Sequence, residues 1–185
     1  MQRERERELD GGAIVPVVGT ETKTRGRTIC ESDVVSFSAL TGDWHPQHSD
    51  AEWAAASRFG ERVAHGMLVL SYAVGLVPFD PDRVVALRGL ESATFKRPVR
   101  IGDTISVRSR VEEVRELDSE HAIVTFGWRI TNQAGQVVAR VRVAALWRGA
   151  GHEKSAAARP AGIARNGSVA AAADETAGDP VQVLL

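Results

Sequence analysis

Residues 67–77 are apolar almost all the way around a helix, with only Ser71 and Gly75 as interruptions. Gly66 opens this stretch and Pro78 ends it, because proline cannot continue a helix. A helix that is hydrophobic on every side has to be buried on every side. The stretch is also too short to cross a bilayer. We therefore expect a central buried helix around which the remaining elements pack.

Every element predicted after Pro78 is a strand. Candidate strands cover residues 84–98, 104–114 and 122–130, and a turn at 132–135 leads to a last strand from Val137. Apolar residues in the last three strands recur at every second position, the period of a half-buried strand. Strands of this kind around one apolar helix predict an α+β fold, a curved antiparallel sheet wrapped around the central helix. Because such a sheet leaves edges and a poorly covered face, we expect a homodimer or a higher homo-oligomer.

The chain of 185 residues is long enough for one domain with tails. Residues 1–22 begin with alternating Arg and Glu and contain Gly11, Gly12 and Pro16, so we expect a flexible N-terminal segment. The domain is predicted over residues 23–149. Residues 150–185 are rich in Ala and Gly and lack aromatic side chains, and are expected to form a disordered tail.

Composition excludes several classes of partner. Lys and Arg number 23 against 24 Asp and Glu, whereas nucleic-acid binding usually requires a basic excess. We therefore expect no nucleic acid and no membrane as partners. Cys30 is the single cysteine and cannot form an intramolecular disulfide, and no secretory signal is apparent at the start. These observations favour a cytoplasmic protein.

A group of polar residues precedes the central helix. Ser32 is a candidate N-cap of a helix that ends at Gly42, and Asp50 is a candidate cap of a second short helix. Between them lie Asp43 and His48, five positions apart across a loop that Pro46 stiffens. An imidazole titrates near neutrality and a neighbouring carboxylate can orient it or hold a water. The two side chains can therefore share proton transfer at one point.

Gly66 adds a second component. Its N–H, in the first turn of the central helix, lacks an intrahelical acceptor and can polarise a carbonyl oxygen placed beyond the helix end. An acid/base pair beside such a donor suits proton chemistry next to a carbonyl, such as water addition across a double bond conjugated to a thioester. The alternative is a metal site of His45 and His48 completed by an aspartate. No further histidine cluster supports it, so we expect no metal.

Two separated motifs carry a family resemblance. The first is Gly42-Asp43-x-x-Pro46-x-His48-x-Asp50, followed by Phe59 and Val63-Ala64-His65-Gly66; the second is Phe95-x-x-Pro98-Val99-x-x-Gly102-Asp103-Thr104. Together they resemble the MaoC-like family of dehydratases and (R)-specific enoyl-CoA hydratases over residues 23–148. The resemblance implies a hot-dog fold that is dimeric or higher and acts on acyl-thioesters without a metal or redox cofactor, coenzyme A being part of the substrate. The implied reaction is the reversible hydration of trans-2-enoyl-CoA to (R)-3-hydroxyacyl-CoA.

By position, Asp43 and His48 match the catalytic pair of this family, and Gly66 matches its oxyanion donor. The chain departs from the family at His45, where an Asn is usual, which leaves the fine tuning of the pair open. We expect substrate contacts from Trp44, at the acyl pocket, and from His45. His65 is a further candidate, with a structural role at the helix start as its alternative.

Lys96, Arg97 and Arg100 form a basic cluster that could meet the phosphates of coenzyme A; the alternative is a solvated strand end. Three other functions remain open for the whole chain: a non-catalytic acyl-binding hot-dog subunit, a thioesterase, and a dehydratase acting on acyl-carrier-protein substrates. Acyl chain length, the type of carrier and the physiological direction do not follow from the sequence.

Overall fold

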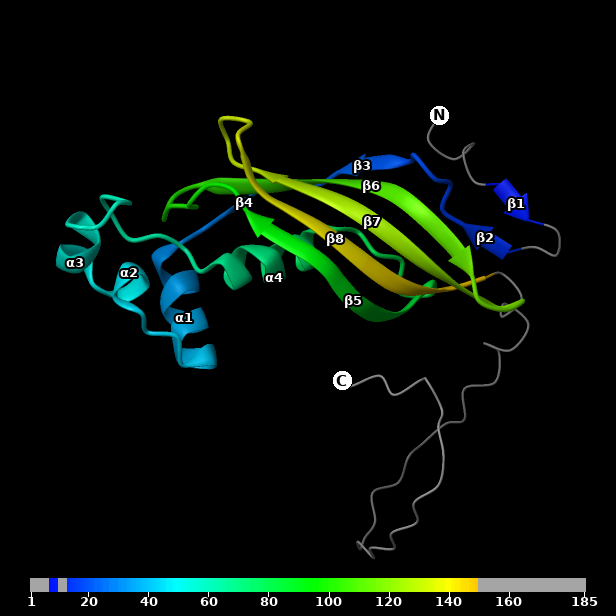
Figure 1. Cartoon of the computed structure of the whole chain (residues 1–185), viewed down its shortest axis with the longest axis horizontal. Coiled ribbons are helices and arrows are strands. Elements are labelled where there is room, and N and C mark those ends of the chain that lie inside the picture. Colours follow the sequence, from blue (N-terminus) through cyan, green and yellow to red (C-terminus); the bar gives the residue numbers. More distant parts are fainter. Residues whose placement is uncertain (1–6, 10–12, 150–185) are drawn as a thin grey trace, which may run out of the picture.

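The computed structural model describes residues 7–9 and 13–149 (Figure 1). The predicted tail, residues 150–185, lies outside the described residues. The elements are, in chain order, β1 (Arg7–Leu9), β2 (Ala13–Val15), β3 (Glu21–Lys23), β4 (Arg27–Thr28), α1 (Glu31–Thr41), α2 (Pro46–Ser49), α3 (Ala51–Ala55), α4 (Gly66–Leu76), β5 (Val84–Phe95), β6 (Thr104–Glu116), β7 (His121–Thr131) and β8 (Val137–Arg148).

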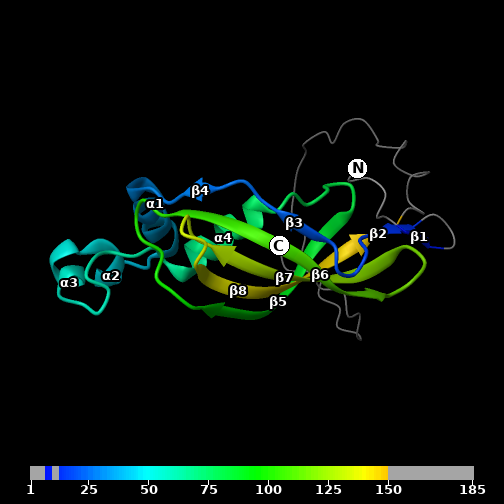
Figure 2. The ribbon, with the colours of Figure 1, turned by 90° about the horizontal axis from the view of Figure 1, so that it is seen from above.

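One antiparallel sheet has the strand order β3-β6-β7-β8-β5, and β4 pairs with β6 beside this path. The long strands curve over α4, while α1, α2 and α3 lie beyond one end of the sheet (Figures 1 and 2). The predicted arrangement of a curved antiparallel sheet around a central apolar helix is confirmed. Strands β7 and β8 both begin close to the predicted positions, and β6 runs two residues further, to Glu116.

The core lies between α4 and the inner face of the sheet. Alternate residues of the long strands point toward the helix, and Val107, Ile130 and Val143 are fully buried. Leu68, Val69, Leu70 and Ala73 supply the buried side of α4. The period-2 pattern of the sequence therefore identifies the core side of β6, β7 and β8 correctly, although residues 122–126 of β7 are buried on both faces.

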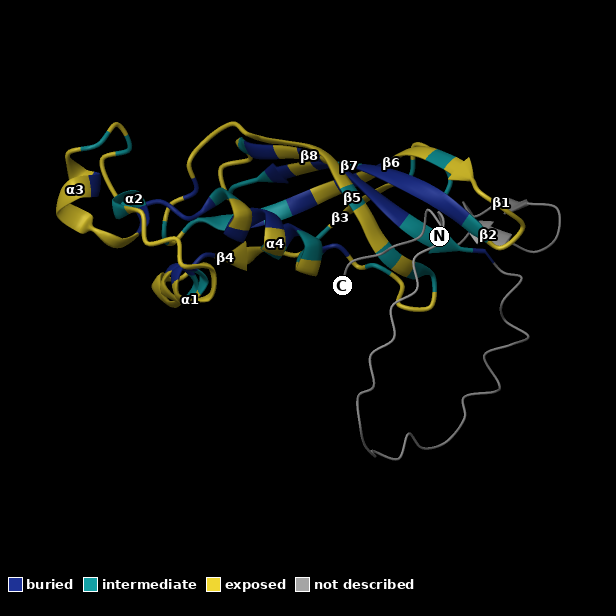
Figure 3. Cartoon of the chain, turned by 60° about the horizontal axis from the view of Figure 1, so that its bottom comes forward, coloured by how far each residue is buried: buried dark blue, intermediate teal, exposed yellow. Residues whose placement is uncertain are grey.

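The helix itself is buried on one side only, contrary to the expectation that it is enclosed on all sides. Met67 is 53% exposed, and Ser71 and Gly75 continue an exposed stripe along α4 (Figure 3). These positions are four residues apart and therefore share one face of the helix. The exposed stripe thus consists of Met67 and the two interruptions of the apolar stretch, Ser71 and Gly75.

The N-terminal segment also differs from the expectation of a flexible lead-in. Strands β1 and β2 pair with each other, and β3, which begins before the predicted boundary at residue 23, pairs with β6. Val15 is buried.

The N-cap of helix α1 is Cys30, two residues before the predicted cap Ser32. The Asp33 carboxylate stabilises this helix start, because it accepts a hydrogen bond from the Cys30 N–H at 2.7 Å. None of the helices in the described part of the chain is long and apolar enough to span a membrane.

Candidate active site

The polar residues of the first motif lie in residues 42–49, which we call the site loop. Helix α1 ends at Gly42, whose φ of 78° is the left-handed conformation that favours glycine. The single turn α2 then begins at Pro46, and the His45 side chain caps it, because His45 Nδ1 accepts a hydrogen bond from the Gln47 N–H at 3.2 Å. Asp50 caps α3 as predicted, accepting from the Trp53 N–H at 3.0 Å. The site loop is thus a tightly capped connection between α1 and α3.

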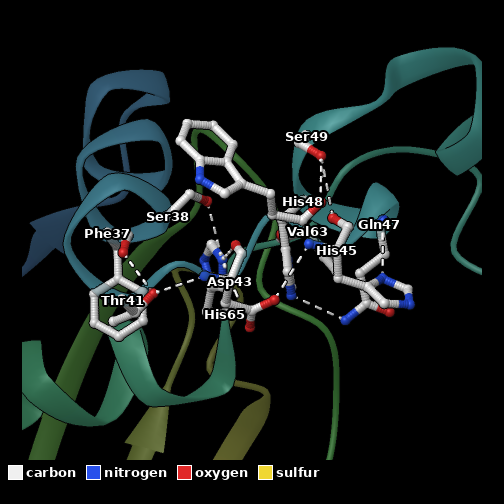
Figure 4. Close-up of polar contacts among 11 residues, drawn as sticks. Phe37, Ser38, Thr41, Asp43, His45, Gln47, His48, Ser49, Val63 and His65 are labelled. Carbon is white, nitrogen blue, oxygen red and sulfur yellow. Dashed lines mark hydrogen bonds and ion pairs between the residues drawn. The ribbon is translucent and has the colours of Figure 1, made fainter.

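Asp43 lies at the start of this loop with its carboxylate half exposed. Its Oδ1 accepts a hydrogen bond from the His45 N–H at 3.2 Å, and its own N–H donates to Thr41 Oγ1 at 3.3 Å. These two bonds fix the backbone on both sides of the residue (Figure 4). Neighbouring apolar side chains therefore do not enclose the carboxylate, which remains open to water or substrate.

His48 is buried, with 5% of its surface exposed. Its Nδ1 lies 2.6 Å from the Val63 carbonyl oxygen, an acceptor, so Nδ1 carries the proton of the neutral ring. The other nitrogen, Nε2, is then the acceptor and lies 3.1 Å from the Gln47 side-chain amide. The Val63 carbonyl thus selects the tautomer in which Nε2 can take a proton.

Burial lowers the pKa of the His48 imidazole, because the charged form loses solvation. The hydrogen bond to the Val63 carbonyl acts in the opposite direction, and the neighbouring His65 lowers the pKa further. The two imidazoles are stacked, with ring centroids 3.7 Å apart and an angle of 26° between the rings. His48 is consequently neutral at pH 7, the state that a general base requires.

His65 is held from two sides. Its Nε2 lies 3.2 Å from Ser38 Oγ and 3.0 Å from the Asp43 carbonyl oxygen, and both His65 and Ser38 are almost fully buried. His65 Nδ1 is buried without a hydrogen-bond partner. The Asp43 carbonyl oxygen can only accept, so Nε2 carries a proton and donates it to this oxygen. These contacts support the structural role of His65, because the ring links α1, the site loop and α4.

Asp43, His48 and His65 also offer ligand atoms within 4.8 Å of one another, which raises the question of a metal ion. Imidazole lone pairs lie in the plane of the ring, and the two rings here are stacked and nearly parallel. Their lone pairs therefore cannot converge on one ion at about 2 Å, the usual length of a bond from zinc to histidine. His48 Nδ1 and His65 Nε2 are moreover already bound to carbonyl oxygens. The three residues do not fit a metal site in this arrangement.

Gly66 is the first residue of α4, where its N–H has no intrahelical acceptor. A Cβ at this position would lie 2.9 Å from the Phe95 ring, so the glycine also permits the close approach of Phe95. Gly66 borders a cavity of about 380 Å³ between α4 and the end of β5. Gln47, Phe59, Val69, Phe95 and Val138 are among the other residues that line it. The cavity is thus mainly apolar and has a helix N-terminus in its wall.

The predicted binding residues separate into two groups. Lys96 and Arg97 line this cavity, and both are exposed. Arg100 does not line it: its Nε lies 2.6 Å from a Glu61 carboxylate oxygen. Trp44 is 52% exposed and is absent from the cavity wall, so this chain alone does not place the indole at an acyl pocket.

Two residues of the site were not predicted from the sequence. The lining of the cavity includes Gln47 but neither Asp43 nor His48. Because the Gln47 side chain also contacts His48 Nε2, it connects the buried base to the cavity. Its position next to His48 in the motif was the available signal. Ser38, which bonds His65 across 27 positions, gave none, since a serine on a helix is ordinarily solvated.

The fold agrees with that of known proteins. A protein of Mycobacterium tuberculosis described as having a double hotdogfold superposes with a TM-score of 0.66 at 17% identity, covering 80% of this chain and 51% of that one. The unliganded R-hydratase PhaJ1 from Pseudomonas aeruginosa superposes with a TM-score of 0.58 at 34% identity, covering 70% of this chain and 80% of that one. The chain therefore has a hot-dog fold.

Sequence comparison also assigns the chain to a protein family. The profile of the family described as "MaoC like domain" matches residues 14–133, so the chain belongs to the MaoC-like hydratase and dehydratase family. An (R)-specific enoyl-CoA hydratase from Rhodospirillum rubrum is 34% identical over 118 residues, which cover 64% of this chain and 79% of the relative. Protein MaoC from Klebsiella aerogenes is 45% identical over 91 residues, covering 49% of this chain but only 27% of that longer protein.

Proposed function

We propose that this chain is a hydro-lyase that adds water to a trans-2-enoyl thioester to give the (R)-3-hydroxyacyl thioester, and catalyses the reverse dehydration. The observation that carries the proposal is the pairing of Asp43 with His48. The two side chains offer polar atoms within 4.8 Å of each other, and the His48 tautomer leaves Nε2 as a proton acceptor. Membership of a family with hydratase-named relatives supports the same reaction.

In hydration, the water oxygen forms a bond to C3 of the enoyl group while the water gives up one proton. His48 Nε2 is the acceptor for that proton, and the exposed Asp43 carboxylate holds the water against the base. As the bond forms, electron density moves to the thioester oxygen, where the Gly66 N–H and the N-terminal end of α4 stabilise it. A proton returned from the pair to C2 completes the addition. The reaction therefore needs no metal or redox cofactor.

Substrate binding follows from the cavity beside Gly66. Its apolar lining suits the acyl chain, and Lys96 and Arg97 at its wall suit the phosphates of coenzyme A. The lining is formed by residues such as Val69 and Val138, whose size would limit the chain length accepted. An acyl-carrier protein would present its acyl group through the same opening, so the chemistry does not depend on the carrier.

We further propose that the active protein is a homodimer joined through β5. This strand lies at the edge of the sheet, where its outer backbone groups lack a partner strand. It exposes Val85, Leu87 and Leu90, and Met67 on α4 adds to the exposed apolar surface. A second copy pairing along β5 would cover this surface.

The catalytic proposal is tested with a short enoyl-CoA, following the loss of the enoyl absorbance and identifying the product by mass spectrometry. We expect Asp43→Asn and His48→Gln each to lower the hydration rate at least about a thousandfold, within the range for general acid/base groups. The chain offers a matched control in Asp118 and His121, an aspartate–histidine pair between β6 and β7 with 3.2 Å between Oδ1 and Nδ1.

The control variants Asp118→Asn and His121→Gln should retain the full rate. Hydration that survives both Asp43→Asn and His48→Gln would contradict the proposal. Release of free thiol, without a hydrated product, would instead identify a thioesterase. Oligomeric state is measured by sedimentation: the dimer proposal expects the mass of two chains, and a single-chain mass that persists at high concentration would refute it.

A further inference from the structure

The face of the sheet that is turned away from α4 carries a row of positive charges. In the strand register, Lys23 of β3 lies opposite Arg108 of β6, Arg108 lies opposite Arg129 of β7, and Arg129 lies opposite Arg140 of β8. All four residues are exposed. Four cations therefore follow one another across four adjacent strands.

Such a row is unfavourable by itself, because like charges on directly opposed positions repel each other at a separation of about 5 Å between Cβ atoms. The chain has a net charge of only −1, so the row is a local concentration and does not reflect a basic composition. Neighbouring carboxylates or a bound anion would offset this repulsion.

Carboxylates compensate only part of the row. Glu21 lies 3.4 Å from Arg108 and 3.8 Å from Arg110, and therefore serves two arginines. Arg142, the next outward residue of β8, is surrounded by three glutamates at 2.9, 3.2 and 3.9 Å: Glu112, Glu91 and Glu113.

By contrast, Arg129 and Arg140 have no carboxylate partner among the residues that the structure describes. They are neighbours on adjacent strands, at the β7–β8 end of the row.

This pair lies in a hollow of about 410 Å³ on the outer face. Its lining contains five arginines and two glutamates, together with Ser92 and Thr94 of β5 as hydroxyl donors. Gly127 shapes one end of it, because a Cβ there would overlap the Glu112 carboxyl group. Glu112 can therefore lie flat over Gly127 and bond Arg142 at 2.9 Å, which keeps this carboxylate on Arg142.

We propose that Arg129 and Arg140, with Arg108 beside them, form a binding site for a phosphate monoester. Two adjacent guanidinium groups present planar donor forks, which match the oxygens of a phosphate dianion and hold it by charge-assisted bidentate bonds. The hollow has the size of a small-ligand site. The site lies on the face of the sheet away from α4 and Gly66, so it is separate from the proposed catalytic cavity and does not depend on the hydratase proposal.

The probe is inorganic phosphate, titrated into the full-length protein by calorimetry, with sodium chloride at equal ionic strength as the reference. The double variant R129Q/R140Q should bind phosphate about tenfold or more weakly, since it loses both forks. The matched control is R115Q, which removes one exposed arginine of β6 outside the hollow and should leave phosphate binding unchanged. A circular-dichroism melt verifies that each variant is folded.

A second arm distinguishes the source of the phosphate. Vesicles of phosphatidylcholine with phosphatidic acid present the same monoester on a lipid headgroup, and phosphatidylcholine alone serves as the reference. Binding of the phosphatidic acid vesicles that R129Q/R140Q abolishes assigns the site to a headgroup; binding of phosphate without the vesicles assigns it to a small phosphorylated molecule. Phosphate binding no tighter than chloride, or equal in the wild type and R129Q/R140Q, would overturn the proposal.

Discussion

The site loop and the sheet are held by different kinds of interaction. In and around the loop, side chains bond directly to backbone groups: His45 to the Gln47 N–H, His48 to the Val63 carbonyl and His65 to the Asp43 carbonyl. The sheet is held by regular backbone ladders and by apolar side chains that alternate toward α4. Loop substitutions should therefore change the chemistry more than the stability, and sheet substitutions should do the reverse.

The sheet half of this comparison is tested most severely at Ile130, which is fully buried in the core. Ile130→Ala removes buried methyl groups and leaves a cavity, so we expect the free energy of unfolding to fall by about 2–5 kcal/mol. Urea denaturation measures this loss. The hydration rate per folded molecule should stay close to that of the wild type. A variant with unchanged stability and a lost rate would break the distinction between the two regions.

The site-loop part of this comparison predicts how the hydration rate depends on pH. Because the pKa of His48 lies below its ordinary value of 6.5, the base stays neutral until the pH falls to this lowered pKa. The hydration rate should then fall about tenfold per pH unit, as protonated His48 cannot accept a proton. A rate profile from pH 4 to 8 locates this limb, which should vanish from any residual activity of His48→Gln. A limb centred above 6.5 would contradict the assignment.

The same shift affects stability, and its sign can be stated. Between the lowered folded pKa and 6.5, the unfolded chain binds more protons at His48 than the folded chain does. Stability therefore decreases as the pH falls through this window, and no further contribution from His48 is lost below the folded pKa. Denaturation at several pH values would show the decrease reduced in His48→Gln.

Gly66, at the start of α4, lies between the site loop and the sheet, and the variant Gly66→Ala tests this position. The added Cβ would meet the Phe95 ring at 2.9 Å, and because this ring is half exposed at a strand end it can rotate away. We expect little change in stability but a loss of about tenfold in kcat, since a shift of about 1 Å in the cavity wall misplaces the thioester. Gly75→Ala, on the same helix with open space at its Cβ, is the matched control and should keep its kcat.

The smallest effect is expected at Ser38. Ser38→Ala removes one hydrogen bond to His65 Nε2 but leaves the bond from that nitrogen to the Asp43 carbonyl. The loss should be about 1 kcal/mol of unfolding free energy, the usual value for a neutral hydrogen bond. Thermal melting measures it. A much larger loss, or a hydration rate as low as that of Asp43→Asn, would show that the loop depends on Ser38 more than its contacts indicate.

Local patterns predicted much of this molecule. Gly42, Pro46 and Asp50 act through their own backbone or through residues three positions away, so the shape of the site loop follows from the sequence. The alternation in β6, β7 and β8 reflects burial on one face, and it identified the core side of the sheet. In both cases the interacting residues lie close in sequence or repeat regularly.

Long-range features escaped prediction because they depend on register and packing. The His48–His65 stack joins residues 17 positions apart, and the row of arginines appears only when β6, β7 and β8 are aligned. The composition of α4 indicated full burial, yet composition cannot tell whether the cover comes from the same chain or from a second copy. The position of Arg100 against Glu61 likewise depends on an isolated bridge between Val63 and Arg100.

The orientation of His48 has a consequence for how this enzyme can change over evolution. The imidazole is aligned by the main-chain carbonyl of Val63, which any amino acid at that position would supply. The Val63 side chain, meanwhile, lines the cavity. Replacing it would reshape the space for the acyl group and leave the ring tautomer as it is. In the proposed mechanism, acyl preference and proton transfer would thus depend on separate atoms of one residue, so selection could alter the first while conserving the second.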